Sequence, residues 1–353
     1  MVSTLHDVAR IAGVSIKTVS NVVNDYPHVS AATRDRVLSA IAELDYRPNL
    51  SARGLRSGKT GVIGLAIPEL RQVYFAELAD SIIRAAARYK LDVVIDQTSS
   101  IRESEVAVLS GKRLRLTDGI IFSPERLGQG DIDLLEVGFP LVLLGERMFG
   151  GPTDHVTMHN VESARAGTEH LIGIGRRRIA VIGAHPDDQD DISSANLRIR
   201  GYREALEAAG LPQDPALIRA AMPWHSENGA AAMRAMLDEG VSFDAVFTLT
   251  DTLGLGVLRA LGEAGVRVPE DVAVLGFDNI DEGRFSVPSL STVEPGRDEI
   301  AQVAVDMLVE RINEKGDRKP PRQILADYRI VGRESTGFSG PTEHTEAIGP
   351  LPE

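Results

Sequence analysis

The chain has 353 residues, 43% hydrophobic and 25% charged, and should fold around at least two cores because single cores rarely exceed about 250–300 residues. No apolar run approaches the roughly 18–20 residues of a membrane span, and the N-terminal sequence lacks the basic and apolar regions of a secretory signal, so we expect a cytoplasmic protein without membrane contact. The absence of cysteine excludes disulfides, thiolate catalysis and cysteine-based metal sites, and eight histidines without an HExxH-like pair indicate neither metal nor cofactor.

The net charge of −13 is distributed unevenly along the chain. Residues 1–60 hold eight Lys and Arg against five Asp and Glu, a net charge of +3, and the remaining residues carry a net charge of −16. An evenly acidic protein would repel nucleic acid at long range. This distribution instead predicts a basic, DNA-binding module in front of an acidic body.

Two short helices are predicted at the N-terminus. Thr4 and Asp7 have the spacing of a capping box, and the helix that they begin should end at Gly13. Ser15 is the expected N-cap of a second helix, with Val14 and Val19 at the positions of a hydrophobic staple. About three residues around a glycine therefore join the two helices, which is the helix-turn-helix spacing.

A third helix is predicted after a polar segment. Ser30 should cap it, and its apolar stripe consists of Val37, Leu38, Ile41 and Leu44. Three short helices can share one small core, so we expect an all-α headpiece.

The exposed start of the second helix carries hydroxyl, amide, cationic and apolar side chains. In a helix-turn-helix this end of the second helix meets base edges in the major groove, so a DNA-reading helix is predicted. The alternative is a solvated helix face in a small protein-binding module. The side chains are Ser15, Ile16, Lys17, Thr18, Ser20 and Asn21.

Residues 49–60 are basic and too short to form a stable isolated helix. We interpret them as a linker that orders on a partner. Gly54 and the run Gly58 to Thr60 imitate a phosphate-binding loop, but three residues rather than the required four separate the two glycines, and a strand follows where a helix is needed.

From Gly61 onward, short β-branched runs alternate with amphipathic helical stretches, which predicts parallel sheets covered on both faces. The length, about 275 residues, exceeds one doubly wound sheet of ordinary size, so we expect two similar α/β lobes with a cleft between them. The predicted strands are 62–67, 92–96, 119–122, 141–144, 179–182, 245–248 and 272–275, and the helices include 74–89, 161–174, 196–209, 226–239 and 252–264.

Ligands on open parallel sheets bind beyond the carboxyl ends of the strands, and two such ends facing each other make an enclosed pocket. The residues just past the predicted strands include carboxylates, amides, hydroxyls, one arginine and the only tryptophan, which suit a polyol ring. They are Pro68, Glu69, Gln72, Tyr74, Phe75, Asp96, Gln97, Ser123, Pro124, the loop 185–198, Trp224, Thr250, Asp251, Asp278 and Asn279.

Several sequence runs along the chain are far more informative together than any one of them is alone. They include HDVARIAGVSIKTVSNVVND from residue 6, DGIIFSP from 118, RIRGYREAL from 198, TLTDTLGLGVLRAL from 248 and VPEDVAVLGFDN from 268. Together they resemble the lactose/galactose repressor (LacI/GalR) family over residues 4 to about 336. The resemblance implies a helix-turn-helix headpiece over 1–48, a hinge helix or linker over 49–60, and a two-lobed, periplasmic-binding-protein-like domain for effector binding and dimerisation over 61–338.

The same resemblance implies that the chain crosses between the lobes near Asn160, 287–292 and 320–324. The N-lobe then comprises about 61–160 and 292–320, and the C-lobe about 161–288 and 323–338. The final stretch, 339–353, is rich in Pro, Gly, Glu and Thr, which predicts disorder.

For DNA, the resemblance implies a homodimer, or a dimer of dimers, whose paired headpieces read a palindromic operator. Ile16, Lys17 and Asn21 match the main base-reading positions, and Leu55 matches a wedge leucine that unstacks a base step from the minor groove. Thr18, Ser20 and Asn24 match phosphate-contact positions. The full set of expected DNA contacts is Thr4, Ser15, Ile16, Lys17, Thr18, Ser20, Asn21, Asn24, Asn49, Ser51, Ala52 and Leu55.

For the effector, the resemblance implies contacts from Tyr74, Phe75, Ser123, Ser194, Arg198, Trp224, Thr250 and Asp278. Two alternatives stay open: Arg198 and Asp278 could form a structural ion pair bridging the lobes, and Tyr74 and Phe75 could simply pack in the core at a helix start. The chain departs from the family pattern where Gln72-Val73 replaces Asn-Pro, Thr250 replaces Asn, Glu294-Pro295 replaces Gln, and His159 replaces Asp. The lining of the pocket is therefore expected to differ from the usual family pattern.

The predicted function is a sequence-specific transcriptional regulator, most simply a repressor, controlled by a small-molecule effector such as a sugar. The alternative is a sugar-binding protein without a DNA-binding role, but a periplasmic one would need a signal peptide and would carry no headpiece. An enzyme is not predicted, because the sequence has no Gly-x-Ser-x-Gly elbow and no Gly-x-Gly-x-x-Gly after a strand. The loop 185–191 lacks the spacing of a calcium site and is interpreted as an acidic surface loop.

Overall fold

The computed structural model of the chain describes residues 3–23, 26–46, 59–185 and 192–338. The chain divides into two compact units, Met1–Gly61 and Val62–Glu353, each described below by itself. Of the predicted linker only Lys59 and Thr60 fall in the described ranges, and the predicted tail lies outside them. No helix in these ranges combines the length and apolar character that a membrane span requires.

The first unit contains three helices, α1 (Leu5–Ala12), α2 (Ile16–Val23) and α3 (Ala31–Glu43). The Thr4–Asp7 capping box forms, and Gly13 ends α1 with a left-handed φ of 63°, which glycine adopts at little cost. The shared core consists of Val8, Ala9, Ala12, Val19, Val22, Val37, Ala40 and Tyr46.

One residue of the predicted apolar stripe of α3 is exposed rather than buried. Leu38 is 50% exposed, whereas Val37 and Ala40 are buried and Ile41 and Leu44 pack against the core. At about 100° per residue, the buried stripe of α3 is centred on Val37 and Ala40, which turns Leu38 away.

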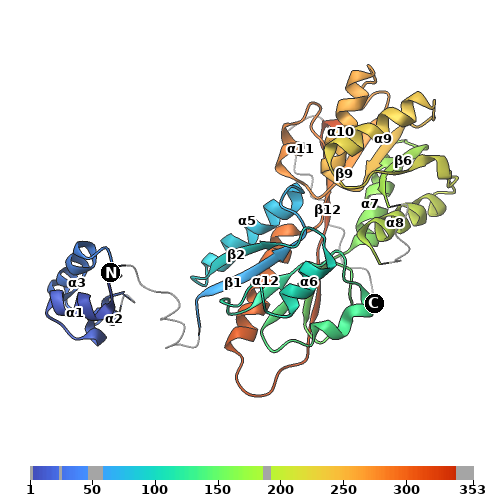
Figure 1. The fold of residues 1–353 in the computed structure, drawn as a ribbon. Coiled ribbons are helices and arrows are strands. Elements are labelled where there is room, and N and C mark those ends of the chain that lie inside the picture. The colour runs from blue at the N-terminus through green and yellow to red at the C-terminus, as the bar shows by residue number, and fades with distance from the viewer. Residues whose placement is uncertain (1–2, 24–25, 47–58, 186–191, 339–353) are drawn as a thin grey trace. The chain divides into compact units, whose positions relative to one another are not determined.

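The second unit contains two lobes, each built on a six-stranded sheet. Figure 1 shows the first lobe around β1, β2, α5 and α12 and the second around β6, β9 and α7 to α10. The first sheet has the order β11-β5-β4-β3-β1-β2 and is parallel throughout. The second has the order β12-β10-β9-β8-β6-β7 and is parallel except for the β10–β12 pair.

The first lobe comprises β1 (Val62–Ile67), α5 (Val73–Ala87), β2 (Asp92–Gln97), α6 (Arg102–Leu109), β3 (Ile120–Phe122), η1 (Gln129–Leu135), β4 (Leu141–Leu144), β5 (Asp154–Met158), α12 (Arg297–Asn313) and β11 (Gln323–Ala326). The second lobe comprises α7 (Asn160–Gly173), β6 (Ile179–Ala184), α8 (Ser194–Ala208), η2 (Pro215–Leu217), β7 (Ile218–Ala220), α9 (Ser226–Asp238), β8 (Ala245–Thr248), α10 (Asp251–Glu263), β9 (Ala273–Phe277), α11 (Asp281–Phe285), β10 (Ser291–Glu294), β12 (Arg329–Val331) and η3 (Glu334–Thr336).

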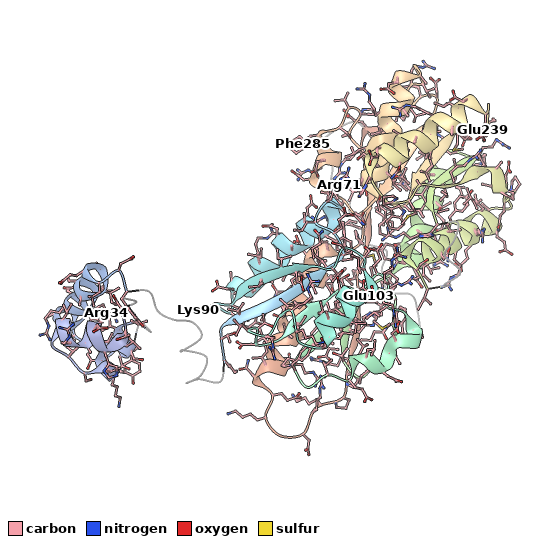
Figure 2. The ribbon with its side chains drawn as sticks, in the orientation of Figure 1. Arg34, Arg71, Lys90, Glu103, Glu239 and Phe285 are labelled. Carbon is pink, nitrogen blue, oxygen red and sulfur yellow. The ribbon has the colours of Figure 1, made fainter. Side chains whose placement is uncertain are left out.

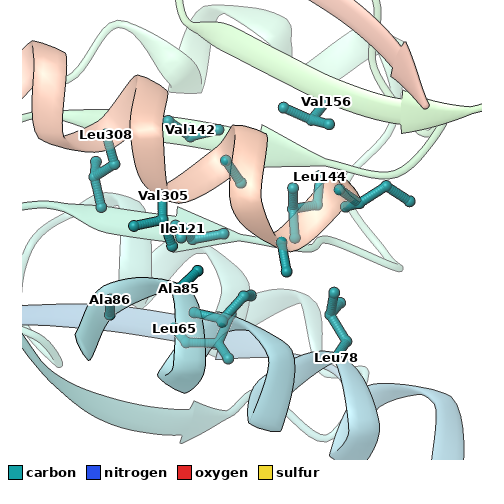
Figure 3. Packing of buried hydrophobic residues seen from close by; sticks show 14 of the residues in the cluster. Leu65, Leu78, Ala85, Ala86, Ile121, Val142, Leu144, Val156, Val305 and Leu308 are labelled. Atoms are coloured by element: carbon teal, nitrogen blue, oxygen red, sulfur yellow. The ribbon is translucent and has the colours of Figure 1, made fainter. Parts of the chain in front are cut away.

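Helices cover both faces of each sheet, as the predicted doubly wound lobes require. In the first lobe, Leu78 of α5 and Val305 and Leu308 of α12 pack on Leu65 and the neighbouring strands (Figure 3). The opposite face is covered by α6 and η1. In the second lobe, α9 and α10 cover one face and α7 and α8 the other. The central strands of both sheets are therefore buried on both faces, which explains why they are near-continuous apolar runs.

Two of the three lobe crossings lie further along the chain than predicted. The first crossing leads into α7 at Asn160, near the expected place. However, β10 pairs with β9 in the second sheet, so the second crossing follows Glu294, and β11 pairs with β5 in the first sheet, so the third follows Ala326. These pairings depend on strands too short and too polar to be recognised by apolar patterning.

Candidate functional site

The predicted DNA-reading side chains lie on α2, away from its buried face. Val19 and Val22 bury one face of α2, whereas Lys17 is exposed and Ser20 and Asn21 are half-buried. Ile16 is also half-buried, but part of its side chain packs against the headpiece core. These four positions share one side of a helix because of its 3.6-residue period.

The cap of α2 also forms as predicted. Ser15 Oγ accepts the N–H of Thr18 at 3.1 Å and lies 2.9 Å from the Thr18 hydroxyl. Thr4 is engaged with Asp7 at the start of α1. The remaining predicted DNA contacts, Asn24, Asn49, Ser51, Ala52 and Leu55, lie outside the described residues.

A cavity of about 260 Å³ is enclosed between the two lobes at the carboxyl ends of their strands. All eight predicted effector residues line it. Tyr74, Phe75 and Ser123 come from the first lobe, and Ser194, Arg198, Trp224, Thr250 and Asp278 come from the second. The structure therefore brings together in one cavity residues that are spread over more than 200 positions of sequence.

Arg198 and Asp278 are two deeply buried charged residues of the cavity, each with 3% of its surface exposed. Arg198 is held from several sides. Its guanidinium carbon lies 3.6 Å from the centroid of the Phe277 ring and 5.7 Å from that of the Trp224 ring. Gly201 in the same helix lets α8 lie against α7, because a side chain there would overlap the carbonyl oxygen of Val161. Helix packing and two ring faces thus hold the guanidinium in place.

Hydrogen bonds fix the orientation of Arg198. Nε donates to Asn160 Oδ1 at 2.9 Å, and Nη1 donates to the carbonyl oxygen of Leu249. Nη1 also lies 3.9 Å from Asp278 Oδ1. Burial lowers the pKa of Arg198, and the carboxylates of Asp278 and Glu146 oppose that effect. The cation is held by directed bonds rather than by bulk water.

Two carboxyl groups face this cation. Burial raises the pKa of Asp278 from its ordinary 3.8 to about 7, against the opposing effect of Arg198. Burial likewise raises the pKa of Glu146, which Arg198 and hydrogen bonds from Ser194 and Asn160 oppose. A cation, carboxyl groups and hydroxyls in one cavity can donate to and accept from the hydroxyls of a polar ligand.

The turn that carries Asp278 is strained. Asp278 and Asn279 have φ values of 112° and 52°, a backbone region that residues other than glycine rarely adopt. Asp251, fully buried, holds the turn by accepting the N–H of Ile280 at 2.9 Å and the hydroxyl of Thr292 at 2.7 Å. The strain is thus maintained by bonds from α10 and β10.

Aromatic rings form another part of the wall. Trp224 Nε1 donates to the carbonyl oxygen of Gly183 at 2.9 Å, so the polar edge of the indole is satisfied. Tyr74 and Phe75 pack edge to face with centroids 5.3 Å apart. Both also pack against the first-lobe core, so the predicted roles in core packing and in the cavity wall are both fulfilled.

Two important residues were not among the predicted effector contacts. Glu146 lines the cavity just past β4, and Asn160, at the crossing into α7, bridges Arg198 and Glu146 with its two amide atoms. Inspection of the residues after strand 141–144 would have found Glu146 by the rule applied to the other strands. Asn160 was predicted only as a crossing point.

The structure also decides one of the open alternatives. Arg198 and Asp278 do approach each other, but both belong to the second lobe, so their pair does not bridge the lobes. Within the described ranges, no group of three or more His, Asp or Glu side chains is arranged to hold a metal ion. The proposed acidic loop contributes His185 to the cavity wall, and residues 186–191 lie outside the described ranges.

The architecture defines a class: a helical DNA-reading module followed by a two-lobed ligand-binding domain. Residues 4–49 match the model of bacterial regulatory proteins of the lacI family, and residues 168–336 match the periplasmic binding protein-like domain. The chain is 32% identical over 335 residues to catabolite control protein A of Priestia megaterium, covering 94% of this chain and 99% of that protein.

Solved structures agree with this match. A LacI-family regulator from Sanguibacter keddieii is 50% identical, with a TM-score of 0.73, 79% of this chain and 99% of that chain covered. The regulator CelR in complex with cellobiose is 31% identical, with a TM-score of 0.67 and coverages of 94% and 99%. The Lac repressor dimer bound to operator and the anti-inducer ONPF is 28% identical, with a TM-score of 0.79 and coverages of 95% and 99%.

The chain belongs to the LacI family of bacterial regulatory proteins. It is a DNA-binding transcriptional repressor controlled by a small molecule, and not an enzyme. The predicted family, fold class and general function are therefore confirmed.

The raised pKa of Asp278 predicts a pH dependence of stability. Its folded-state pKa of about 7 exceeds the ordinary 3.8, so between these values the folded chain holds a proton that the unfolded chain has released. The wild type should therefore lose stability relative to Asp278→Asn as the pH rises from 5 to 7.5, by about 2 kcal/mol. Urea unfolding of both proteins at the two pH values measures this difference, and a difference that is the same at both would contradict the burial of Asp278.

Proposed function

We propose that the chain is a homodimeric repressor that reads a palindromic operator and whose effector is an uncharged sugar or sugar derivative bound between the lobes. The observation that carries the effector assignment is the cavity itself, in which Arg198, two carboxyl groups and three aromatic rings converge. A protein that binds operator DNA acts in the cytoplasm, where that DNA lies.

The chemistry of the cavity supports a polyol as the ligand. Carboxyl and hydroxyl oxygens accept from sugar hydroxyls, a guanidinium donates to them, and the indole of Trp224 offers a face to the apolar side of a pyranose ring. A carboxyl group whose pKa lies near neutrality, as that of Asp278 does, can accept from a sugar hydroxyl when it is ionised and donate to one when it is protonated, which suits a neutral polyol. The CelR relative, whose structure holds cellobiose, is consistent with this class of ligand.

The headpiece supports base reading by α2. Ile16, Lys17 and Asn21 are proposed to contact base edges, and Ser15, Thr18 and Ser20, with Thr4 and Asn24, to position the module on phosphates. The hinge contacts, Asn49, Ser51, Ala52 and Leu55, are proposed from the family resemblance, with Leu55 as the wedge that kinks the operator.

Apolar side chains exposed on both lobes support a homodimer. Val94 on the edge strand β2 is 48% exposed, Phe285 at the end of α11 is 74% exposed, and Val287 beyond it is 95% exposed (Figure 2 labels Phe285). Phe285 and Val287, only two positions apart, are the apolar groups that a second copy is proposed to cover. Two copies would present two headpieces, as a palindromic operator requires.

The operator-binding role predicts different effects for two neighbouring side chains. Lys17→Ala should relax the base preference at one position of each half-site, at a cost of about 1–3 kcal/mol on the preferred sequence. Thr18→Ala should weaken binding to all sequences about equally, because a phosphate contact carries no base preference. Operator sequences selected from random DNA by the wild type and each variant measure this, and identical selected sequences for all three proteins would contradict base reading by Lys17.

The effector role predicts a thermal shift that depends on Arg198. Cellobiose, D-glucose or D-ribose at about 100 times its dissociation constant should stabilise the full chain by about 2.7 kcal/mol and raise its melting temperature. Arg198→Lys should remove the shift, because a lysine cannot reproduce the planar contacts. The control Arg203→Lys, on the exposed side of α8, should keep it. No shift with a panel of neutral sugars, together with a shift from a sugar phosphate, would contradict the proposed ligand.

A further inference from the structure

A carboxylate of the first lobe binds the second lobe beside the Asp278 turn. Glu77, on α5, accepts the N–H of Asp281 on its Oε1 at 2.8 Å, and Asp281 is the first residue of α11 in the second lobe. Glu77 Oε2 forms an ion pair with Arg297 Nη1, and the two side chains are only 20% and 15% exposed. This pair is therefore largely shielded from solvent, where ion pairs are screened least.

The same guanidinium also holds the Asp278 turn. Arg297 begins α12, which packs in the first lobe, yet its Nη1 lies 3.3 Å from the carbonyl oxygens of both Asp278 and Asn279. Glu77 orients this guanidinium from the other side. One ion pair thus contacts three backbone groups in and beside the turn, namely the carbonyl oxygens of Asp278 and Asn279 and the N–H of Asp281.

The other bonds to the turn come from the second lobe. Asp251 accepts from Ile280, Asn279 Nδ2 donates to Glu294, and Arg333 donates to Asn279 Oδ1. These groups belong to α10, β10 and the segment after β12. Glu77 and Arg297 therefore differ from them, because they connect the turn to helices of the first lobe.

Other contacts join the lobes without touching the turn. Arg71, which Figure 2 labels between the lobes, lies 3.5 Å from Glu227, and His225 lies 3.3 Å from Glu69. Arg71 and Glu227 are 65% and 67% exposed, so their pair should contribute little.

We propose that Glu77 and Arg297 are positioning residues that hold the strained Asp278 turn in its ligand-facing conformation only while the lobes are closed. The inference rests on the proposed role of Asp278 in effector binding. Lobe closure and the placement of Asp278 then become a single event. A ligand that favours this placement of Asp278 also favours the closed angle, and any change of angle that separates α5 and α12 from α11 releases the turn.

Hydrogen exchange on the ligand-free full chain tests this directly. Removing the acceptor in Glu77→Ala, or the cation in Arg297→Gln, should speed amide exchange in residues 278–285 by at least about tenfold through local opening. Glu77→Gln keeps an oxygen that can accept from Asp281 and should be intermediate. The double variant should exchange no faster than either single variant, because the two side chains act as one unit.

A control carboxylate lies elsewhere in the same lobe. Glu103 is exposed on α6, which covers the opposite face of the first sheet, so Glu103→Ala should leave exchange in 278–285 unchanged. Unchanged exchange in Glu77→Ala and Arg297→Gln would overturn the proposal. Equal acceleration over the whole of both lobes, with a lower urea midpoint, would also overturn it, since that is the behaviour of a merely structural pair. The measurement uses no sugar and no DNA, so its result does not depend on whether the proposed effector is correct. The two proposals can therefore fail separately.

Discussion

The burial of one guanidinium constrains the whole ligand-binding domain. A buried charge is unfavourable by several kcal/mol unless paired and hydrogen-bonded, so Arg198 can exist only where the fold supplies partners on every side. Phe277 and Trp224 supply ring faces, Leu249 a carbonyl oxygen, Asp278 a carboxyl group and Asn160 an amide. Asn160 lies where the chain crosses between lobes, so the environment of the cation depends on how the lobes meet.

The surrounding structure maintains these partners. Asp251, tied to β10 through Thr292, supports the left-handed turn of Asp278, while Glu77 and Arg297 support it from the first lobe. A cavity built in this way has polar groups already oriented for a ligand, and its Asp278 turn loses the support of the first lobe when the lobes separate. That is the arrangement expected of a domain that converts occupancy into a change of lobe angle.

An element could be predicted from the sequence where the residues that stabilise it lie close together in the chain. The strands 62–67, 141–144 and 245–248 were predicted to the residue because each is a continuous apolar run buried on both faces. In contrast, β5 escaped prediction: its buried Asp154 is paired with Arg311 and Arg322, which lie more than 150 positions away. The eight cavity residues were predictable from motifs, whereas the Glu77–Arg297 pair depends on the packing of two lobes, which no local pattern records.

The coupling between ligand binding in the cavity and operator binding by the headpiece can be measured as a ratio of affinities. Operator affinity is determined with and without a saturating neutral sugar, and sugar affinity, followed by the fluorescence of the single tryptophan, Trp224, is determined with and without operator. If lobe closure sets operator affinity, the two ratios must be equal and should fall in the range of about 5 to 150. Operator affinity that is unaffected by a sugar bound in the cavity would contradict the account.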